Sequence, residues 1–207
     1  MFLTTATGAE ALEDAVFRAM FEARKRVFVD LLKWDVPVRA GRYEVDQFDT
    51  PDATYLILTD GIGSHLGSAR LLPTQRPHIL DTLFPELCEG PVPSGPGVQE
   101  ITRFCLDPRQ NSRQRRSTRD TLVHALAAHA LDVGINRFTG VAEFGWFQQI
   151  LAFGWDCRPL GLPRQVEGSL LGALTIAITP ETPTLLARAG LVPSATPSGV
   201  ADRRHAA

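Results

Sequence analysis

Several features that mark specialised classes of protein are scarce or absent in this 207-residue sequence. The 3 cysteines (Cys88, Cys105 and Cys157) form an odd, widely spaced set without a CxxC pair, which predicts reduced thiols in a cytoplasmic protein. No apolar run approaches the ~20 residues that a membrane-spanning helix requires. The first residues lack the basic and apolar segments of a signal peptide. The formal net charge of −2 argues against a general nucleic-acid-binding protein.

Metal-ligand patterns are missing as well. His124 and His129 stand five residues apart, off one helical face, and no carboxylate lies at ligand spacing from them. We therefore expect neither a metal nor a bound cofactor. The length suits one domain with a sizeable core, and the sequence shows no repeat and no second domain boundary.

The central stretch of the chain is residues 98–106, which alternate as a β-strand does. The alternation places Glu100 and Arg103 on opposite faces. Pro108 ends the strand, an arginine-rich loop follows, and Ser117 begins a helix in a capping-box-like pattern. A strand, a basic loop and a helix N-terminus suit a phosphate-bearing ligand, although an ordinary buried strand with a solvated loop fits this stretch equally well.

The chain before this strand combines aromatic, acidic and basic residues. Residues 10–32 are predicted to be a helix on which Phe21, Arg24 and Phe28 share a face. An acidic segment, residues 43–52, is interleaved with aromatic residues, so its carboxylates are expected to pack inward and to need cationic partners. Residues 54–59 and 66–72 form a hairpin that contains Arg70, for which the acids at positions 46, 49 and 100 are the expected partners.

The remaining pattern predicts alternating helices and strands. Beyond the arginine-rich loop we expect a helix at 117–132, strands at 137–142 and 170–179, and short helices at 144–153 and 180–189. The resulting fold class is α/β, a single sheet with helices on its faces.

Together these residues resemble the LuxI-type acyl-homoserine-lactone synthases, the enzymes that make quorum-sensing autoinducers. The resemblance covers roughly residues 17 to 180. Its motifs are Arg24, Phe28 and Trp34 near the N-terminus, the acidic segment Glu44-Val45-Asp46-Gln47-Phe48-Asp49, the strand Arg70-Leu71-Leu72-Pro73-Thr74, the turn Phe84-Pro85, and the core Glu100-Ile101-Thr102-Arg103-Phe104.

The resemblance implies a GNAT-like mixed sheet with helices on both faces and a V-shaped cleft for the acyl donor. It implies a synthase domain, which we place at residues 1–190. The composition of residues 191–207, rich in Pro, Ser, Gly, Ala and Arg, predicts a flexible tail. The resemblance also implies transfer of an acyl group from an acyl carrier protein, or acyl-CoA, to the amine of S-adenosylmethionine. Lactone closure then releases methylthioadenosine, and a separate receptor reads the product.

The candidate site residues follow from the resemblance and from the chemistry of these substrates. A sulfonium favours aromatic faces and nearby carboxylates, and an ammonium must lose a proton before it attacks a thioester. We assign catalysis to Glu100, as the base, and to Arg103, which with Arg24 and Arg70 holds the acids. The S-adenosylmethionine site and its supporting network comprise Arg24, Phe28, Trp34, Asp46, Asp49, Arg70 and Phe104. The acyl pocket comprises Phe84, Thr139, Val141, Trp146 and Leu151, and carrier docking falls to Arg109, Arg113, Arg115, Arg116 and Arg119.

Two other functions compete with this one. A generic GNAT N-acyltransferase would use acyl-CoA on another amine, and it would need no sulfonium site. A non-catalytic effector domain would bind an acyl carrier without turnover. A purely structural role for members of the acid–arginine network also stays open.

Overall fold

Residues 1–7, 14–193 and 200–203 are described in a computed structural model of the chain, which forms two units. The first unit comprises Met1–Arg70, Arg103–Val123 and Pro193–Ala207, and the second comprises Leu71–Thr102 and His124–Val192. Strands β5 (His65–Pro73) and β6 (Val98–Leu106) and helix α3 (Ser112–Val133) each contribute residues to both units.

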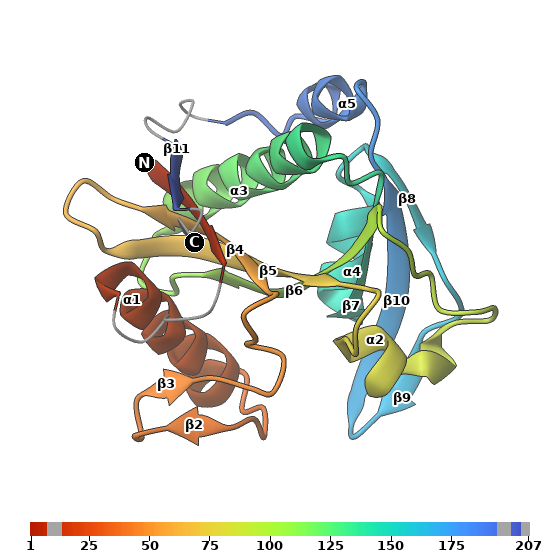
Figure 1. Ribbon diagram of the computed structural model, residues 1–207, viewed down its shortest axis with the longest axis horizontal. Helices are drawn as coiled ribbons and strands as arrows, with labels where there is room; N and C mark the ends of the chain where they lie inside the picture. The colour runs from red at the N-terminus through yellow and green to blue at the C-terminus, as the bar shows by residue number, and fades with distance from the viewer. Residues whose placement is uncertain (8–13, 194–199, 204–207) are drawn as a thin grey trace. The chain divides into compact units, whose positions relative to one another are not determined.

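The first unit is built on strands in the order β11-β1-β4-β5-β6. Besides β5, β6 and α3 it contains β1 (Phe2–Thr7), α1 (Ala15–Arg24), a π-helix η1 (Lys25–Leu31), β2 (Val38–Arg39), β3 (Tyr43–Glu44), β4 (Thr54–Thr59) and β11 (Val200–Arg203). In β4 the run from Tyr55 to Leu58 is fully buried, as expected for a strand with side chains packed on both faces. The small β2–β3 sheet packs against α1 and η1 (Figure 1).

The second unit has strands in the order β6-β7-β10-β8, with β9 also paired to β10. Its own elements are α2 (Ile79–Thr82), a 3₁₀ turn η2 (Pro85–Leu87), β7 (Arg137–Glu143), α4 (Phe144–Leu151), β8 (Asp156–Pro159), β9 (Arg164–Val166), β10 (Ser169–Ala177) and α5 (Thr182–Arg188). Helix α4 lies against β7 and β10 (Figure 1). A Cβ on Gly172 would come within 2.8 Å of the Phe147 ring, so this close approach requires glycine.

Strand β6 departs from the predicted strict alternation. Its buried residues are Glu100, Thr102 and Cys105, because Arg103 has a left-handed backbone with φ of 50° that shifts the alternation by one residue. The parallel pairing of β6 with β7 covers three residue pairs and ends at Glu100↔Thr139.

The predicted start of the long helix at Ser117 is wrong. Helix α3 begins at Ser112, because Asn111 and Gln114 cap it reciprocally. The Gln114 amide donates to Asn111 Oδ1 at 2.9 Å, and the Asn111 amide donates to Gln114 Oε1 at 3.0 Å. Most of the arginines expected in a loop therefore lie on the first turns of a helix.

At the N-terminal side the described helix begins at Ala15, where Asp14 accepts a hydrogen bond from the Val16 amide. Residues 25–31 of the predicted helix are π-helical, and Leu32 follows as the cap. Residues 10–13 of that prediction lie outside the described part of the chain, as do 194–199 and 204–207 of the predicted tail. The one-domain boundary at residue 190 stays a prediction.

The α/β class itself is confirmed. No helix in the described residues is long and apolar enough to span a membrane.

Candidate active site

A network of three arginines and three carboxylates is buried in the first unit. Its members come from α1, the acidic segment, β5 and β6: Arg24, Glu44, Asp46, Asp49, Arg70 and Arg103. Charged side chains are rarely buried this completely unless each one is paired, and each of these six residues has an opposite charge within ion-pair distance.

Arg24 and Asp49 form a two-point ion pair. Arg24 Nη1 lies 2.7 Å from Asp49 Oδ1, Nη2 lies 2.9 Å from Oδ2, and Arg24 Nε donates to Glu44. Asp49 also accepts from the Tyr55 hydroxyl at 2.8 Å. The planar guanidinium thus fixes the orientation of two carboxylates.

Asp46 is held by the other two arginines. Arg70 Nη1 lies 2.6 Å from Asp46 Oδ1, and Arg103 Nη2 lies 2.6 Å from Asp46 Oδ2. Arg103 Nε also donates to Glu44 Oε1 at 3.1 Å. The predicted partnership of Arg70 with Asp46 and Asp49 is therefore observed.

These contacts keep Asp46 and Asp49 ionised. Burial alone would raise the pKa of Asp46, but hydrogen bonding and charge from Arg70 and Arg103 lower that pKa below its ordinary value. Burial likewise acts to raise the pKa of Asp49, and the charges of Arg24 and Arg70 outweigh it and lower the pKa. Both aspartates are therefore charged at neutral pH.

An aromatic pair adjoins this network. Phe28 and Trp34 stack with ring centroids 4.8 Å apart and an interplanar angle of 20°. The Arg103 guanidinium lies 5.5 Å from the Phe28 centroid and 5.9 Å from that of Trp34. The structure thus brings together six of the seven residues assigned to the S-adenosylmethionine site, together with Arg103. The seventh, Phe104, follows Arg103 on β6 and is half-buried.

Two members of this assembly were not among the predicted site residues. Glu44 lies in the acidic segment, but the sequence analysis assigns it no role. Tyr55 lies in a strand whose apolar pattern is typical of an ordinary buried core strand. The spacing of Glu44 two residues before Asp46 could have predicted that both carboxylates point to the same side. Nothing in the sequence predicts the contact of Tyr55 with Asp49.

Glu100 is described within the second unit, where it is fully buried. Its Oε2 accepts a hydrogen bond from the Ile79 amide at 2.8 Å, and Oε1 accepts one from the Leu80 amide at 3.1 Å. Glu100 therefore fixes the first turn of α2 and is itself fixed by it. His78, the preceding residue, is also buried, and its Nε2 has no hydrogen-bond partner among the described residues.

Thr139 is fully buried on β7 as the register partner of Glu100. Its hydroxyl oxygen has no hydrogen-bond partner in the described part of the chain. Phe84 and Val141 pack on an apolar cluster whose buried members are Leu80, Leu87 and Ala173. Trp146, in contrast, packs edge-on against Phe153 at a centroid distance of 5.6 Å, and Leu151 ends α4 half-buried.

The five arginines assigned to carrier docking differ in their surroundings. Arg109 pairs with Asp107 at 2.6 Å and Arg119 with Asp120 at 2.7 Å. Arg113 and Arg116 are exposed one helical turn apart on α3, and Arg115 is half-buried. Arg109 is exposed too but paired, so within the described part of the chain Arg113 and Arg116 are the exposed arginines of this patch for which no ion pair is seen.

A second buried polar group lies at the start of β5. His65 is 2% exposed, and its Nε2 lies 2.9 Å from Ser68 Oγ. Burial lowers its pKa to about 4, the charges of Arg26 and Arg109 act in the same direction, and Asp107 opposes them. No group of three potential metal ligands occurs among the described residues.

The model of the autoinducer synthase family matches residues 9–163. This chain belongs to that family.

Individual relatives agree with this membership. An acyl-homoserine-lactone synthase of Ralstonia nicotianae is 34% identical over 181 residues, which cover 84% of this chain and 88% of the relative. One from Rhizobium etli is 36% identical over 157 residues, 74% of each chain. The structure of BjaI, a CoA-dependent acyl-homoserine lactone synthase solved with SAM and isopentyl-CoA, is 29% identical with a TM-score of 0.80, covering 91% of this chain and 89% of that one.

As an autoinducer synthase the chain is an acyltransferase, an acyl-homoserine-lactone synthase of GNAT-like fold. The predicted family, fold class and enzyme class are confirmed. The roles of the individual site residues stay predictions.

Proposed function

We propose that this autoinducer synthase acylates the amine of S-adenosylmethionine with an acyl group from an acyl carrier protein or coenzyme A. The amine nitrogen forms a bond to the thioester carbon, the C–S bond breaks, and the carrier thiol leaves with a proton. The substrate carboxylate then closes the lactone ring, and methylthioadenosine departs. The observation that carries this proposal is the buried acid–arginine network beside the Phe28–Trp34 pair.

S-adenosylmethionine has a positive sulfonium, a carboxylate and an amine. Stacked aromatic rings and ionised carboxylates attract the sulfonium, and an arginine of the network pairs with the substrate carboxylate. Arg103 is our candidate for that arginine, because its side chain keeps 10% exposure whereas those of Arg24 and Arg70 keep 1% and 0%. We assign Asp46 and Asp49 to orienting these arginines.

Glu100 is our candidate for the base that removes a proton from the substrate ammonium. The Ile79 and Leu80 amides each donate to one of its oxygens, which fixes the orientation of the carboxylate. The two backbone donors stabilise the carboxylate form, which is the form a base requires before it acts.

The acyl chain is assigned to the apolar cluster around Leu80, Leu87 and Ala173, with Phe84 and Val141 at its edge. The Thr139 hydroxyl, which lacks a partner among the described residues, would donate to an oxygen on the third carbon of the chain. Trp146 and Leu151, predicted for the same pocket, lie on α4, which packs over Gly172 and so on the opposite face of β10 from Ala173.

The donor is expected to be protein-borne, because acyl carrier proteins are acidic and Arg113 and Arg116 are exposed on α3. Coenzyme A is the alternative carrier of the acyl group, because the similar protein BjaI is CoA-dependent. We propose that a separate receptor protein binds the lactone product.

The test is incubation of the purified chain with S-adenosylmethionine and acyl donors, followed by mass spectrometry for lactone and methylthioadenosine. Both products must appear in equal amounts. Acylation of some other amine without methylthioadenosine would indicate a generic GNAT acyltransferase. Binding of either substrate without turnover would indicate an effector domain.

A further inference from the structure

We infer that the π-helix η1 and the turn that closes it, with Lys33 at its centre, position the Phe28–Trp34 pair for the sulfonium substrate. The inference rests on the proposed function. It assigns a role to residues outside the binding site, so Lys33 is a positioning residue rather than a catalytic one.

The π geometry of η1 is supported by backbone and side-chain contacts. The Leu32 amide donates to the Val27 carbonyl at 2.9 Å, across five residues rather than the four of an α-helix. Lys25 Nζ lies 2.8 and 3.0 Å from the two carboxylate oxygens of Asp30, again five residues away. The wider turn begins directly after Arg24, which is committed to Glu44 and Asp49.

The closing turn joins the two aromatic residues. Lys33 has a φ of 60°, the left-handed conformation that commonly ends helices. The next residue, Trp34, donates its amide to the Phe28 carbonyl at 2.8 Å. The same two residues stack their rings at 4.8 Å. Backbone closure and ring stacking therefore depend on one another.

An α-helical ending would bring a different residue to this place. In the usual closing motif of an α-helix, the amide that bonds back to a given carbonyl comes from five residues further on. Counted from Phe28, that residue is Lys33. The extra residue in the π turn moves the contact to Trp34, so the π geometry selects the aromatic side chain that lies beside Phe28 and Arg103.

Lys33 provides a way to test this without touching the site, because it is exposed. Lys33→Gly keeps the left-handed conformation, whereas Lys33→Val disfavours it strongly. Glu167→Val is the matched control, since Glu167 is exposed with a φ of 47° in the turn between β9 and β10.

The measurements are the Kd for S-adenosylmethionine by calorimetry, the KM for the acyl donor, and the Tm. We expect Lys33→Val to weaken S-adenosylmethionine binding about tenfold, the order of a lost desolvated cation–π contact, with the acyl-donor KM unchanged within about twofold. Lys33→Gly should bind as the wild type does, and Glu167→Val should lower the Tm without affecting binding.

Equal S-adenosylmethionine affinity in Lys33→Val and Glu167→Val would overturn the inference while leaving the proposed function intact. A wild-type chain that binds no S-adenosylmethionine would instead overturn the proposed function, and the inference with it. If Lys33→Val does not fold, insertion of one alanine after the exposed Asp30 decides. The insertion moves Trp34 to the seventh residue after Phe28 and brings Lys33 to the closing position, so binding should weaken similarly. Unchanged binding would count against the inference.

Discussion

The amide nitrogen of Ile79 lies 2.8 Å from Oε2 of Glu100, and the hydrogen bond between them joins the first turn of α2 to strand β6 within the second unit. Glu100→Gln would turn an NH₂ group towards one of two backbone N–H donors. We expect kcat to fall ~10²–10⁴-fold, since the variant loses the proposed base. A pH–rate profile is the informative measurement, because the acidic limb that reports the base should disappear.

The control for this variant is its structure. Circular dichroism and the Tm must show a folded protein before the rate is interpreted, because a displaced α2 would also reduce turnover. A folded variant that retains activity within a few-fold of wild type would show that Glu100 is not the base.

The acid–arginine network should dominate stability in the first unit. Arg24→Met keeps most of the aliphatic stem but leaves Glu44 and Asp49 short of a buried partner, which typically costs ~3–5 kcal/mol. The matched variant is Arg109→Met, whose ion pair with Asp107 involves a side chain that is 67% exposed. That change should cost less than ~1 kcal/mol. Urea unfolding compares the two, and similar losses would contradict the assignment.

The burial of His65 should make the stability of the protein depend on pH between about 4 and 6.5. Burial lowers its folded pKa from 6.5 to about 4, so the unfolded chain binds more protons between these values. The part of the free energy of unfolding that depends on His65 is therefore fully present above pH 6.5. It is lost as the pH falls towards 4, because unfolding then lets the imidazole bind a proton. The difference corresponds to roughly 3 kcal/mol as an upper value.

The test is urea unfolding of wild type and His65→Gln between pH 7.5 and about 4.5. Gln retains a donor for Ser68 and does not titrate. We expect the wild type to lose stability over this range more steeply than the variant. Parallel curves would mean that His65 does not bind its proton on unfolding. Asp46 and Asp49 act at lower pH, since their lowered pKa values mean that the stability they contribute is lost only below about pH 4.

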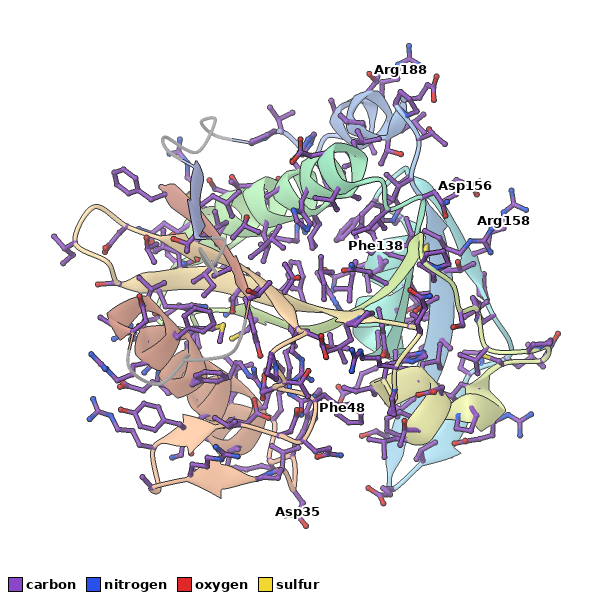
Figure 2. All side chains as sticks on the ribbon, viewed as in Figure 1. Asp35, Phe48, Phe138, Asp156, Arg158 and Arg188 are labelled. Carbon is purple, nitrogen blue, oxygen red and sulfur yellow. The ribbon has the colours of Figure 1, made fainter. Side chains whose placement is uncertain are left out.

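Charge reversal at Arg113 and Arg116 should raise the KM for an acyl carrier protein severalfold and leave the KM for acyl-CoA nearly unchanged. Exposed charges mainly steer encounter, so the effect should shrink as salt is added. Arg158→Glu is the control, because Arg158 is 75% exposed beside Asp156 on β8 (Figure 2). Equal and salt-independent changes for both donors would exclude a docking role.

Thr139→Val keeps the shape of a buried β-branched residue and removes its hydroxyl. If the hydroxyl donates to a 3-oxo group, the preference for 3-oxo over unsubstituted donors should fall about three- to tenfold. Because this hydroxyl has no partner among the described residues, the variant should also be at least as stable as wild type. An unchanged ratio of activities on 3-oxo and unsubstituted donors would show that the hydroxyl does not discriminate between these acyl chains.

Much of the arrangement was predictable because chemistry constrains it. An arginine inside the apolar strand β5 has to be paired, and an acidic segment interleaved with aromatic residues supplies the partners. The hairpin, β7 and β10 follow from β-branched and apolar runs. The start of α3 was mispredicted because the Asn111–Gln114 cap is weaker as a sequence signal than the Ser117–Asp120 pattern, although arginine itself favours helices.

Other features leave no trace in the local sequence. The π geometry after Arg24 uses residues that an α-helix accommodates equally well, so periodicity does not reveal it. The left-handed conformation of Arg103 could not be predicted, because the sequence has an arginine there and not the glycine that usually adopts it. The hydrogen bonds from α2 to Glu100 join residues about twenty positions apart, and only the folded chain brings them together.

The buried network also has consequences during synthesis. Its six members are spread from position 24 to position 103, and Arg103 is the last to be translated. A nascent chain that ends before this residue has three carboxylates for two arginines, and burying the unmatched charge is unfavourable. The first unit is therefore expected to stay open until β6 has left the ribosome. Chains truncated before Arg103 should be recovered as protease-sensitive species, without the acidic segment folded.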